Sequence, residues 1–201
     1  MKTGPKYKIA KRLGAPIYEK TQTQKFAVSE ARGGRSRKRF SKPSDYKRQL
    51  LEKQKMRLTY GLSEKQFRRY VDMAMEKSDD PITYLMKRLE SRLDNVVYRL
   101  GLAKTRRLAR QIVTHGHITV NDRKLNVPSH NVRVNDIVAV REGSRETGLY
   151  VDFTDKYEPN VLPSWLKFDV KKLSGTVIAE PIYQPTESYF DPAQVLEFYS
   201  R

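Results

Sequence analysis

The chain has 201 residues, of which 40 are Lys or Arg and 23 are Asp or Glu, so its formal net charge is +17. A charge of this size attracts polyanions, which makes nucleic acid the leading partner. The absence of cysteine excludes disulfides, thiolate nucleophiles and Cys-ligated zinc or iron–sulfur clusters, and it fits a reducing, intracellular compartment. No stretch approaches the ~18 apolar residues of a membrane span, so we expect a protein that is neither secreted nor spanning.

The amino end carries most of the positive charge. Residues 1–43 hold 13 basic and 2 acidic residues, with several glycines and little amphipathic period. Such a stretch buries too little apolar surface to offset its chain entropy. We therefore expect 1–43 to be a basic, extended N-terminal arm, with Tyr7 and Phe40 between its charges, that RNA orders.

Helical patterns begin at residue 44 and define a predicted helical domain, 44–88. Ser44 is placed to cap one helix, and Ser63 with Gln66 forms a capping box that opens a second. Asp80 as cap and Pro81 at the first position begin what the apolar stripe predicts to be one long helix, which ends before Gly101. The basic residues on the outer side of that helix are either solvated or in contact with phosphates.

Residues 89–150 predict a small α/β module. Thr105 is placed to cap a short helix that stops at Gly116, with an apolar inner face. Strands are expected at 118–120, 124–126 and 137–140, with a tight turn at Asn121-Asp122, and they close a small mixed sheet.

The outer face of the short helix is suited to RNA. Arg106 and Arg110 lie one turn apart and are expected to point outward, with Arg107 and Gln111 beside them. Guanidinium groups at this spacing can meet successive phosphates, and arginine can fork two phosphate oxygens. Because the major groove of A-form RNA is too narrow for side chains to read, we expect recognition by shape and phosphate spacing.

Residues 151–201 reverse the sign of the charge. They hold 5 basic and 8 acidic residues, which disfavours extensive RNA contact. Asp191-Pro192 predicts the start of a final short helix. We expect this segment to pack back on the helical domain, and two interpretations of its aromatic residues stay open: packing alone, or a protein–protein face as well.

Two motifs carry a specific resemblance. R-L-D-N-V-V-Y-R-L-G, at 92–101, and A-R-Q-I-V-T-H-G-H-I-T-V-N, at 109–121, resemble the RNA-binding module called the alpha-L motif. The opening G-P-K-Y-K-I-A-K-R-L-G, the stretch Q-L-L-E-K-Q-K-M-R-L-T-Y-G-L-S-E-K-Q-F and the final E-F-Y-S-R are similar to the S-four family of bacterial small-subunit ribosomal proteins. This resemblance runs from near residue 4 to the last residue.

The resemblance implies an α+β fold in which an alpha-L module is inserted into a helical domain that carries the N-terminal arm. It implies a structural protein of the small ribosomal subunit in the bacterial cytoplasm, which binds the five-prime domain of ribosomal RNA, nucleates assembly and contributes to decoding accuracy. With the charge pattern, it assigns ribosomal RNA contacts to Lys6, Lys8, Lys11, Arg12, Arg48, Lys53, Lys55, Arg68, Arg69, Arg92, Lys104, Thr105, Arg106, Arg107, Arg110, Gln111, His115, His117, Arg123 and Lys124.

Further partners follow from the same resemblance. The family lines the channel through which messenger RNA enters, a role that would fall here to Arg35, Arg37, Lys38, Arg39 and Lys42. It also contacts neighbouring ribosomal protein S-five, with S-three as a further candidate, for which Phe198, Tyr199 and Arg201 are the expected interface. The stretch S-E-A-R-G-G-R-S, at 29–36, departs from the zinc-binding cysteines or P-G-Q-H-G loop of many members, so no zinc site is expected.

Three alternative functions have some support in the sequence. Arg92-Leu93-Asp94 echoes the R-L-D of pseudouridine synthases, but the chain is too short for their catalytic domain, and Asp94 is expected to make a salt bridge or hydrogen bond on a helix surface. His115 and His117 bracket Gly116 without further metal ligands, which favours RNA contact or helix capping. A free RNA-binding translational regulator stays open. We expect no enzyme, no cofactor, no metal and no small-molecule substrate.

Overall fold

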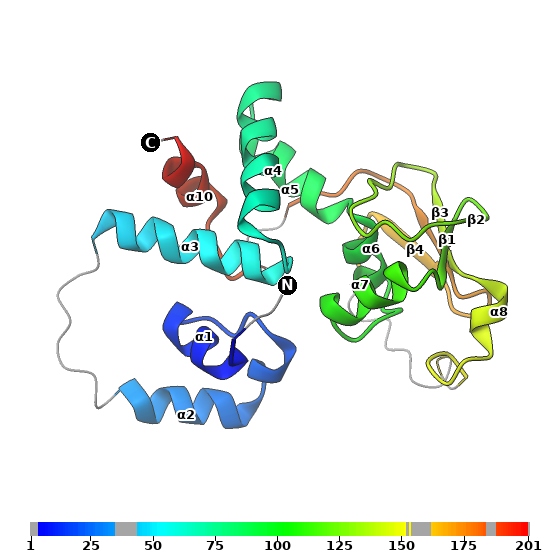
Figure 1. Cartoon of the computed structure of the whole chain (residues 1–201), viewed down its shortest axis with the longest axis horizontal. Coiled ribbons are helices and arrows are strands. Elements are labelled where there is room, and N and C mark those ends of the chain that lie inside the picture. The colour runs from blue at the N-terminus through cyan, green and yellow to red at the C-terminus, as the bar shows by residue number, and fades with distance from the viewer. Residues whose placement is uncertain (1–3, 35–43, 152, 154–161, 184–187, 201) are drawn as a thin grey trace. The chain divides into compact units, whose positions relative to one another are not determined.

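The computed structural model describes residues 4–34, 44–151, 153, 162–183 and 188–200 (Figure 1). The chain divides into one unit of Met1–Leu85 and Gln184–Arg201 and a second unit of Met86–Tyr183. The second unit is therefore an insertion within the first, as the predicted α+β fold class requires.

The first unit is helical. Its elements are α1 (Lys6–Leu13), a 3-10 turn η1 (Glu19–Thr21), α2 (Gln24–Gly34), α3 (Asp45–Thr59), α4 (Glu64–Lys77), the start of α5 (Pro81–Glu90) and α10 (Pro192–Tyr199). The predicted caps are confirmed, since the Ser44 side chain accepts from the amide of Lys47, and Ser63 and Gln66 form the reciprocal capping box. These bonds satisfy amides that the first turn of a helix leaves without intrahelical partners.

Residues 4–34 are not the extended arm that the sequence predicted. They form two helices around their own apolar cluster, which includes Ala10, Leu13 and Phe26, with Leu51 and Leu58 of α3 packed against it. Apolar residues at helical spacing in α1 supply this inner face despite the surrounding lysines. The basic block of residues 35–43 lies outside the described residues.

The predicted single helix from residue 81 to residue 100 is two helices. α5 ends at Glu90 and α6 (Leu93–Arg99) begins after Arg92, whose backbone is extended. The interruption lets the backbone carbonyl of Ser91 accept from the amide of Val132 at 2.9 Å. On the other side of the break, the amide of Leu93 donates to the carbonyl of His130 at 2.9 Å. Backbone pairing with a distant segment thus outweighs local helix propensity, which is worth under about 1 kcal/mol per residue.

The second unit is built on a five-stranded sheet. Its order is β2-β1-β3-β5-β4, and every pair is antiparallel rather than mixed as predicted. The strands are β1 (Ile118–Val120), β2 (Arg123–Lys124), β3 (Ile137–Val140), β4 (Leu166–Asp169) and β5 (Ser174–Val177). The tight turn at Asn121-Asp122 is confirmed, since both residues have positive φ, of 49° and 63°.

Helices α6 and α7 (Arg106–Thr114) cover one face of this sheet (Figure 1). Alternate strand residues such as Val138 and Val140 point into the same core as Val96, Val97 and Ile112 of the two helices. A short helix α8 (Glu142–Arg145) follows β3. The close approach of β5 to α6 needs a glycine, because a Cβ at Gly175 would collide with the side chain of Leu100.

The C-terminal segment is shared between the two units, which corrects the expectation that all of 151–201 packs on the helical domain. β4 and β5 extend the sheet, and Trp165 is buried in the core of the second unit. α10 lies against α3 and α4 in the first unit. Asp191 caps α10 by accepting from the amide of Ala193 at 2.9 Å, as predicted.

Phe26 tests whether the N-terminal helices belong to the folded core. Its side chain is 2% exposed, so Phe26→Ala is expected to lower the free energy of unfolding by about 3–5 kcal/mol in urea titrations followed by circular dichroism. Val28 in the same helix is 49% exposed, and Val28→Ala is expected to change it by less than about 0.5 kcal/mol. Equal stability of the two variants would contradict this packing and favour the interpretation of residues 4–34 as an unfolded arm.

Candidate nucleic-acid interface

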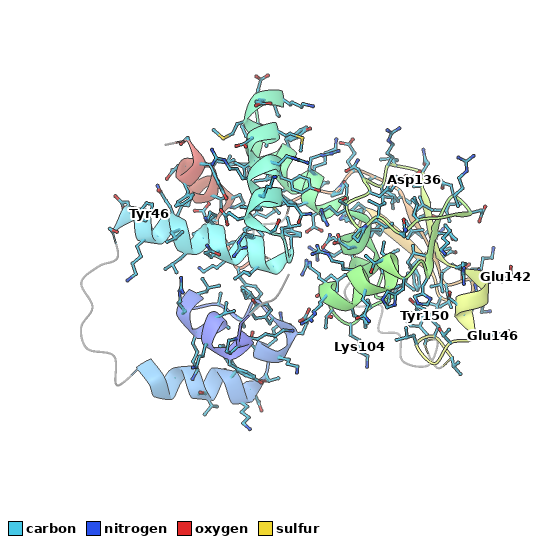
Figure 2. All side chains as sticks on the ribbon, in the orientation of Figure 1. Tyr46, Lys104, Asp136, Glu142, Glu146 and Tyr150 are labelled. Carbon is cyan, nitrogen blue, oxygen red and sulfur yellow. The ribbon has the colours of Figure 1, made fainter. Side chains whose placement is uncertain are left out.

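Helix α7 presents an exposed polar stripe. Thr105 caps it, accepting from the amide of Leu108 at 3.0 Å, and the inner face of the helix is buried. Arg107 and Gln111 are exposed at i and i+4. Exposed His115 continues the stripe just past the last turn, and exposed Lys104 precedes the helix (Figure 2).

The β1–β2 hairpin lies beside the end of α7. Gly116 has φ +74° and turns the chain from the helix into β1. A Cβ at Gly116 would collide with the side chain of Lys124, so this lysine of β2 packs directly over the turn. Lys124 and Arg123 are both exposed, so the hairpin adds two cations to the exposed basic residues of this segment, and Lys124 is the one that lies at the end of α7.

The segment that forms α7 and β1 carries only positive formal charge. Residues 101–121 contain four basic residues and no acidic residue, and Asp122 in the turn is the first carboxylate. A surface with cations from a helix and a hairpin, and little opposing charge, attracts the phosphates of a nucleic acid backbone. We call Lys104, Arg107, Gln111, His115, Arg123 and Lys124 the helix–hairpin face.

Arg106 and Arg110 are half-buried and bonded to α6, rather than directed wholly outward. Arg110 donates from Nε and Nη2 to Oδ2 of Asp94, at 2.9 and 2.7 Å. Arg106 donates from Nε to Oδ1 of Asn95 at 2.8 Å, and its guanidinium lies 4.4 Å from the centroid of the Tyr98 ring. Their positions are fixed from inside the unit.

Arg92 is buried, so a direct RNA contact there is not supported by the structure. Its side chain is 4% exposed and donates to both carboxylate oxygens of Asp94, at 3.0 and 2.8 Å. Asp94 makes the expected salt bridge, but it does so in the interior and not on a helix surface, because its side chain is 5% exposed.

The two histidines at the end of α7 have different surroundings. The His115 and His117 rings are 6.1 Å apart, and Nδ1 of His117 lies 3.0 Å from Oγ of Ser144. Within the described ranges no group of three or more His, Cys, Asp or Glu side chains could hold a metal ion.

Comparisons with known proteins place the chain in a family. Residues 1–90 match the ribosomal protein S4/S9 N-terminal domain, and residues 91–138 match the S4 domain. The chain is 45% identical over 202 residues to the small ribosomal subunit protein uS4 of Roseiflexus castenholzii, covering 98% of each chain. It is 42% identical to the uS4 proteins of Chloroflexus aurantiacus, covering 98% of each, and of Persephonella marina, covering 98% of this chain and 97% of that one.

The chain belongs to the uS4 family of small-subunit ribosomal proteins. It is accordingly a structural, RNA-binding protein and not an enzyme, which removes the pseudouridine synthase alternative. In the part of the chain that the structure describes, no helix is long and apolar enough to cross a membrane.

The RNA-contact residues predicted in the first unit of this uS4 protein divide by exposure. Lys8, Arg12, Arg48, Arg68 and Arg69 are exposed, although Arg48 pairs with Asp45 at 2.9 Å. Other predicted contacts are engaged within the unit: Lys6 lies over the ring of Tyr18, Lys11 donates to Ser29, and Lys55 pairs with Glu52 at 2.7 Å.

Lys53 is buried and lies at the centre of a cluster with α10. Its ammonium pairs with Oε1 of Glu64 at 2.7 Å and lies 4.6 Å from the centroid of the Phe198 ring. Tyr199 donates to the same Oε1 at 2.7 Å and packs against Phe67. Phe198 and Tyr199, expected at a protein interface, thus pack within the first unit, and Arg201 lies outside the described residues.

Sequence reasoning gave two sets of residues in this uS4 chain no role at the candidate interface. Asp94, Asn95 and Glu90 form the polar layer beneath α7, and the available signal was the pair Asp94-Asn95 inside an otherwise apolar helical stripe. The second set is defined by exposed positive charge on the second unit, for which the sequence offers only the charge itself: Arg133, Arg141, Arg145, Lys167, Lys171 and Lys172.

Glu64 gives the first unit an acid-sensitive contact. Burial alone would raise the pKa of Glu64, but hydrogen bonds from Lys53 and Tyr199 and the charges of Lys53 and Arg57 outweigh it and hold the pKa below its ordinary value of 4.5. A depressed carboxyl pKa contributes stability that is present above the unfolded pKa and is lost as pH falls through the folded pKa.

Glu64→Gln is therefore expected to make the free energy of unfolding depend less on pH in the acid range. Wild-type stability in urea should fall as pH drops below about 4.5, and the variant should start lower at neutral pH and lose less. Tyr199→Phe removes one of the bonds to Glu64 and should lie between the two. Parallel pH profiles for all three proteins would contradict the role of this carboxylate.

Proposed function

We propose that this protein binds the five-prime domain of small-subunit ribosomal RNA early in assembly and helps nucleate the particle. The helix–hairpin face carries this proposal, because exposed Arg107 of α7 and exposed Arg123 and Lys124 of β2 belong to one helix–turn–hairpin segment, in which Lys124 packs over the turn at Gly116. The curated relatives are named as proteins of the small ribosomal subunit, which supports the same partner.

The chemistry of the face favours backbone recognition. Arginine and lysine neutralise phosphates and release counterions, and Arg107 adds a planar fork that fits two phosphate oxygens. Gln111 and His115 can donate to phosphate or to a ribose 2′-hydroxyl. This set reads the spacing of an RNA backbone and requires no access to base edges in a deep groove.

The proposal extends to messenger RNA and to decoding accuracy. Arg35, Arg37, Lys38, Arg39 and Lys42 supply a dense positive charge suited to the messenger channel, although they lie outside the described residues. For the contact with S-five, and S-three as a further candidate, the support is the acidic balance of residues 151–201. Since Phe198 and Tyr199 pack on α3 and α4, they would shape such a surface through the placement of α10.

Charge removal on the helix–hairpin face tests RNA binding. Arg107→Gln combined with Lys124→Gln is expected to weaken binding to a five-prime-domain transcript and to lower the slope of log affinity against log salt by roughly 0.7 to 0.9 per contact. Lys65→Gln, an exposed lysine of α4, serves as the control and should leave the slope near that of wild type. An unchanged slope in the double variant would remove this face from the RNA interface.

Association with the particle tests the wider proposal. The tagged protein should sediment with small ribosomal subunits at moderate salt, and purified protein should prefer the five-prime-domain transcript to a three-prime-domain transcript of equal length. Recovery mainly in the light fractions, bound to messenger RNA, would favour a free translational regulator instead.

A further inference from the structure

A buried ionic layer lies directly beneath the helix–hairpin face. Asp94 accepts from two arginines, Arg92 of the helix break and Arg110 of α7, and its Oδ2 receives bonds at 2.8, 2.9 and 2.7 Å. Arg92 and Asp94 are buried, whereas the Arg110 side chain is 30% exposed. One carboxylate thus connects the interior of the second unit to a partly exposed arginine.

The neighbouring residue repeats this arrangement one turn earlier on α7. Asn95 is buried, donates to Oε2 of Glu90 at 2.9 Å, and accepts from Arg106. The Arg106 guanidinium also stacks on Tyr98. Two successive residues of α6 therefore hold two arginines that are spaced i and i+4 on α7.

Stability alone is a weak explanation for such a layer. Replacing a buried ion pair with apolar residues of similar volume is often neutral or stabilising, because desolvation offsets the Coulomb attraction. Holding Arg110 and Arg106 in one geometry has a different use. An arginine ordered in advance loses less side-chain entropy on binding than a free arginine does.

We propose that Asp94 is a positioning residue for RNA binding, which fixes Arg110 from inside the unit so that the exposed part of its guanidinium meets a backbone phosphate in a set orientation. Asn95 does the same for Arg106, and the pair adds two oriented arginines to the helix–hairpin face. This inference rests on the proposed RNA-binding function and names the residue that organises that surface.

Asp94→Asn separates positioning from simple electrostatics. The substitution raises the net charge by one, which by itself strengthens RNA binding. Positioning predicts the opposite: affinity of the full chain for the five-prime-domain transcript should fall about tenfold, the factor expected when a charge-assisted hydrogen bond is lost. Glu142→Gln, at an exposed residue of α8, makes the same charge change and should not weaken binding (Figure 2).

A double-mutant cycle with Arg110→Gln tests whether Asp94 affects RNA binding through Arg110. If Asp94 acts through Arg110, Asp94→Asn should add little in the Arg110→Gln background, and both single variants should show a shallower salt slope. Arg110→Lys, which keeps the charge without the fork, covers the case in which Asp94→Asn fails to fold, and it should also bind more weakly. Circular dichroism at the assay temperature establishes that each variant is folded.

The outcomes distinguish this inference from the proposed function. Folded Asp94→Asn and Arg110→Lys proteins with wild-type or tighter affinity and unchanged slope would overturn the positioning role, and would leave RNA binding intact if Arg107→Gln with Lys124→Gln still weakens it. Absence of RNA binding in the wild-type protein would overturn the proposed function itself.

Discussion

The bonds between Asp94 and the arginines at positions 92 and 110 constrain much of the second unit. A buried carboxylate needs partners, and here the partners come from the residue that interrupts the helical run and from the neighbouring helix. The break after Glu90 places Arg92 in an extended conformation, and the backbone on either side of it then pairs with the segment at 128–132. The ion pairs, the helix break and the backbone pairing are mutually dependent.

The apolar core between the sheet and its helices and the polar layer beneath α7 contribute differently to the structure. Residues such as Val97, Ile112 and Val138 supply the burial that holds the two helices on the sheet. The ionic contacts contribute orientation, since they hold long side chains that would otherwise sample many rotamers. The cations of this region are therefore of two kinds: Arg107 and Lys124 are exposed, while Arg106 and Arg110 are bonded to the interior.

The first unit uses a comparable principle around α3. Its N-terminal helices cover Leu51 and Leu58, and α10 covers another part of α3 through the aromatic pair at 198–199. Lys53 is buried between Glu64 and Phe198, so a cation that composition would assign to RNA is instead part of the packing. The positive charge of this chain thus serves both as an RNA-attracting field and as internal structure.

The sequence by itself determined the elements whose signals are local. Caps at Ser44, Ser63 and Thr105, the turn at Asn121-Asp122 and the strand at 137–140 follow from side-chain hydrogen bonds, positive φ and alternation within a few residues. The inserted RNA-binding module and the family were also within reach, because their motifs are contiguous. These features depend on interactions between near neighbours in the chain.

Only the tertiary structure decided which charged residues reach the surface. Lys53, Arg92 and Arg107 look alike in sequence, yet the first two are buried against carboxylates and the third is exposed. The break at Arg92 and the pairing of β5 with β3 likewise depend on partners more than thirty residues away, and the packing of residues 4–34 depends on contacts between α1, α2 and α3. Long-range pairing outweighs local preference because burial and backbone hydrogen bonds together exceed the small differences in propensity.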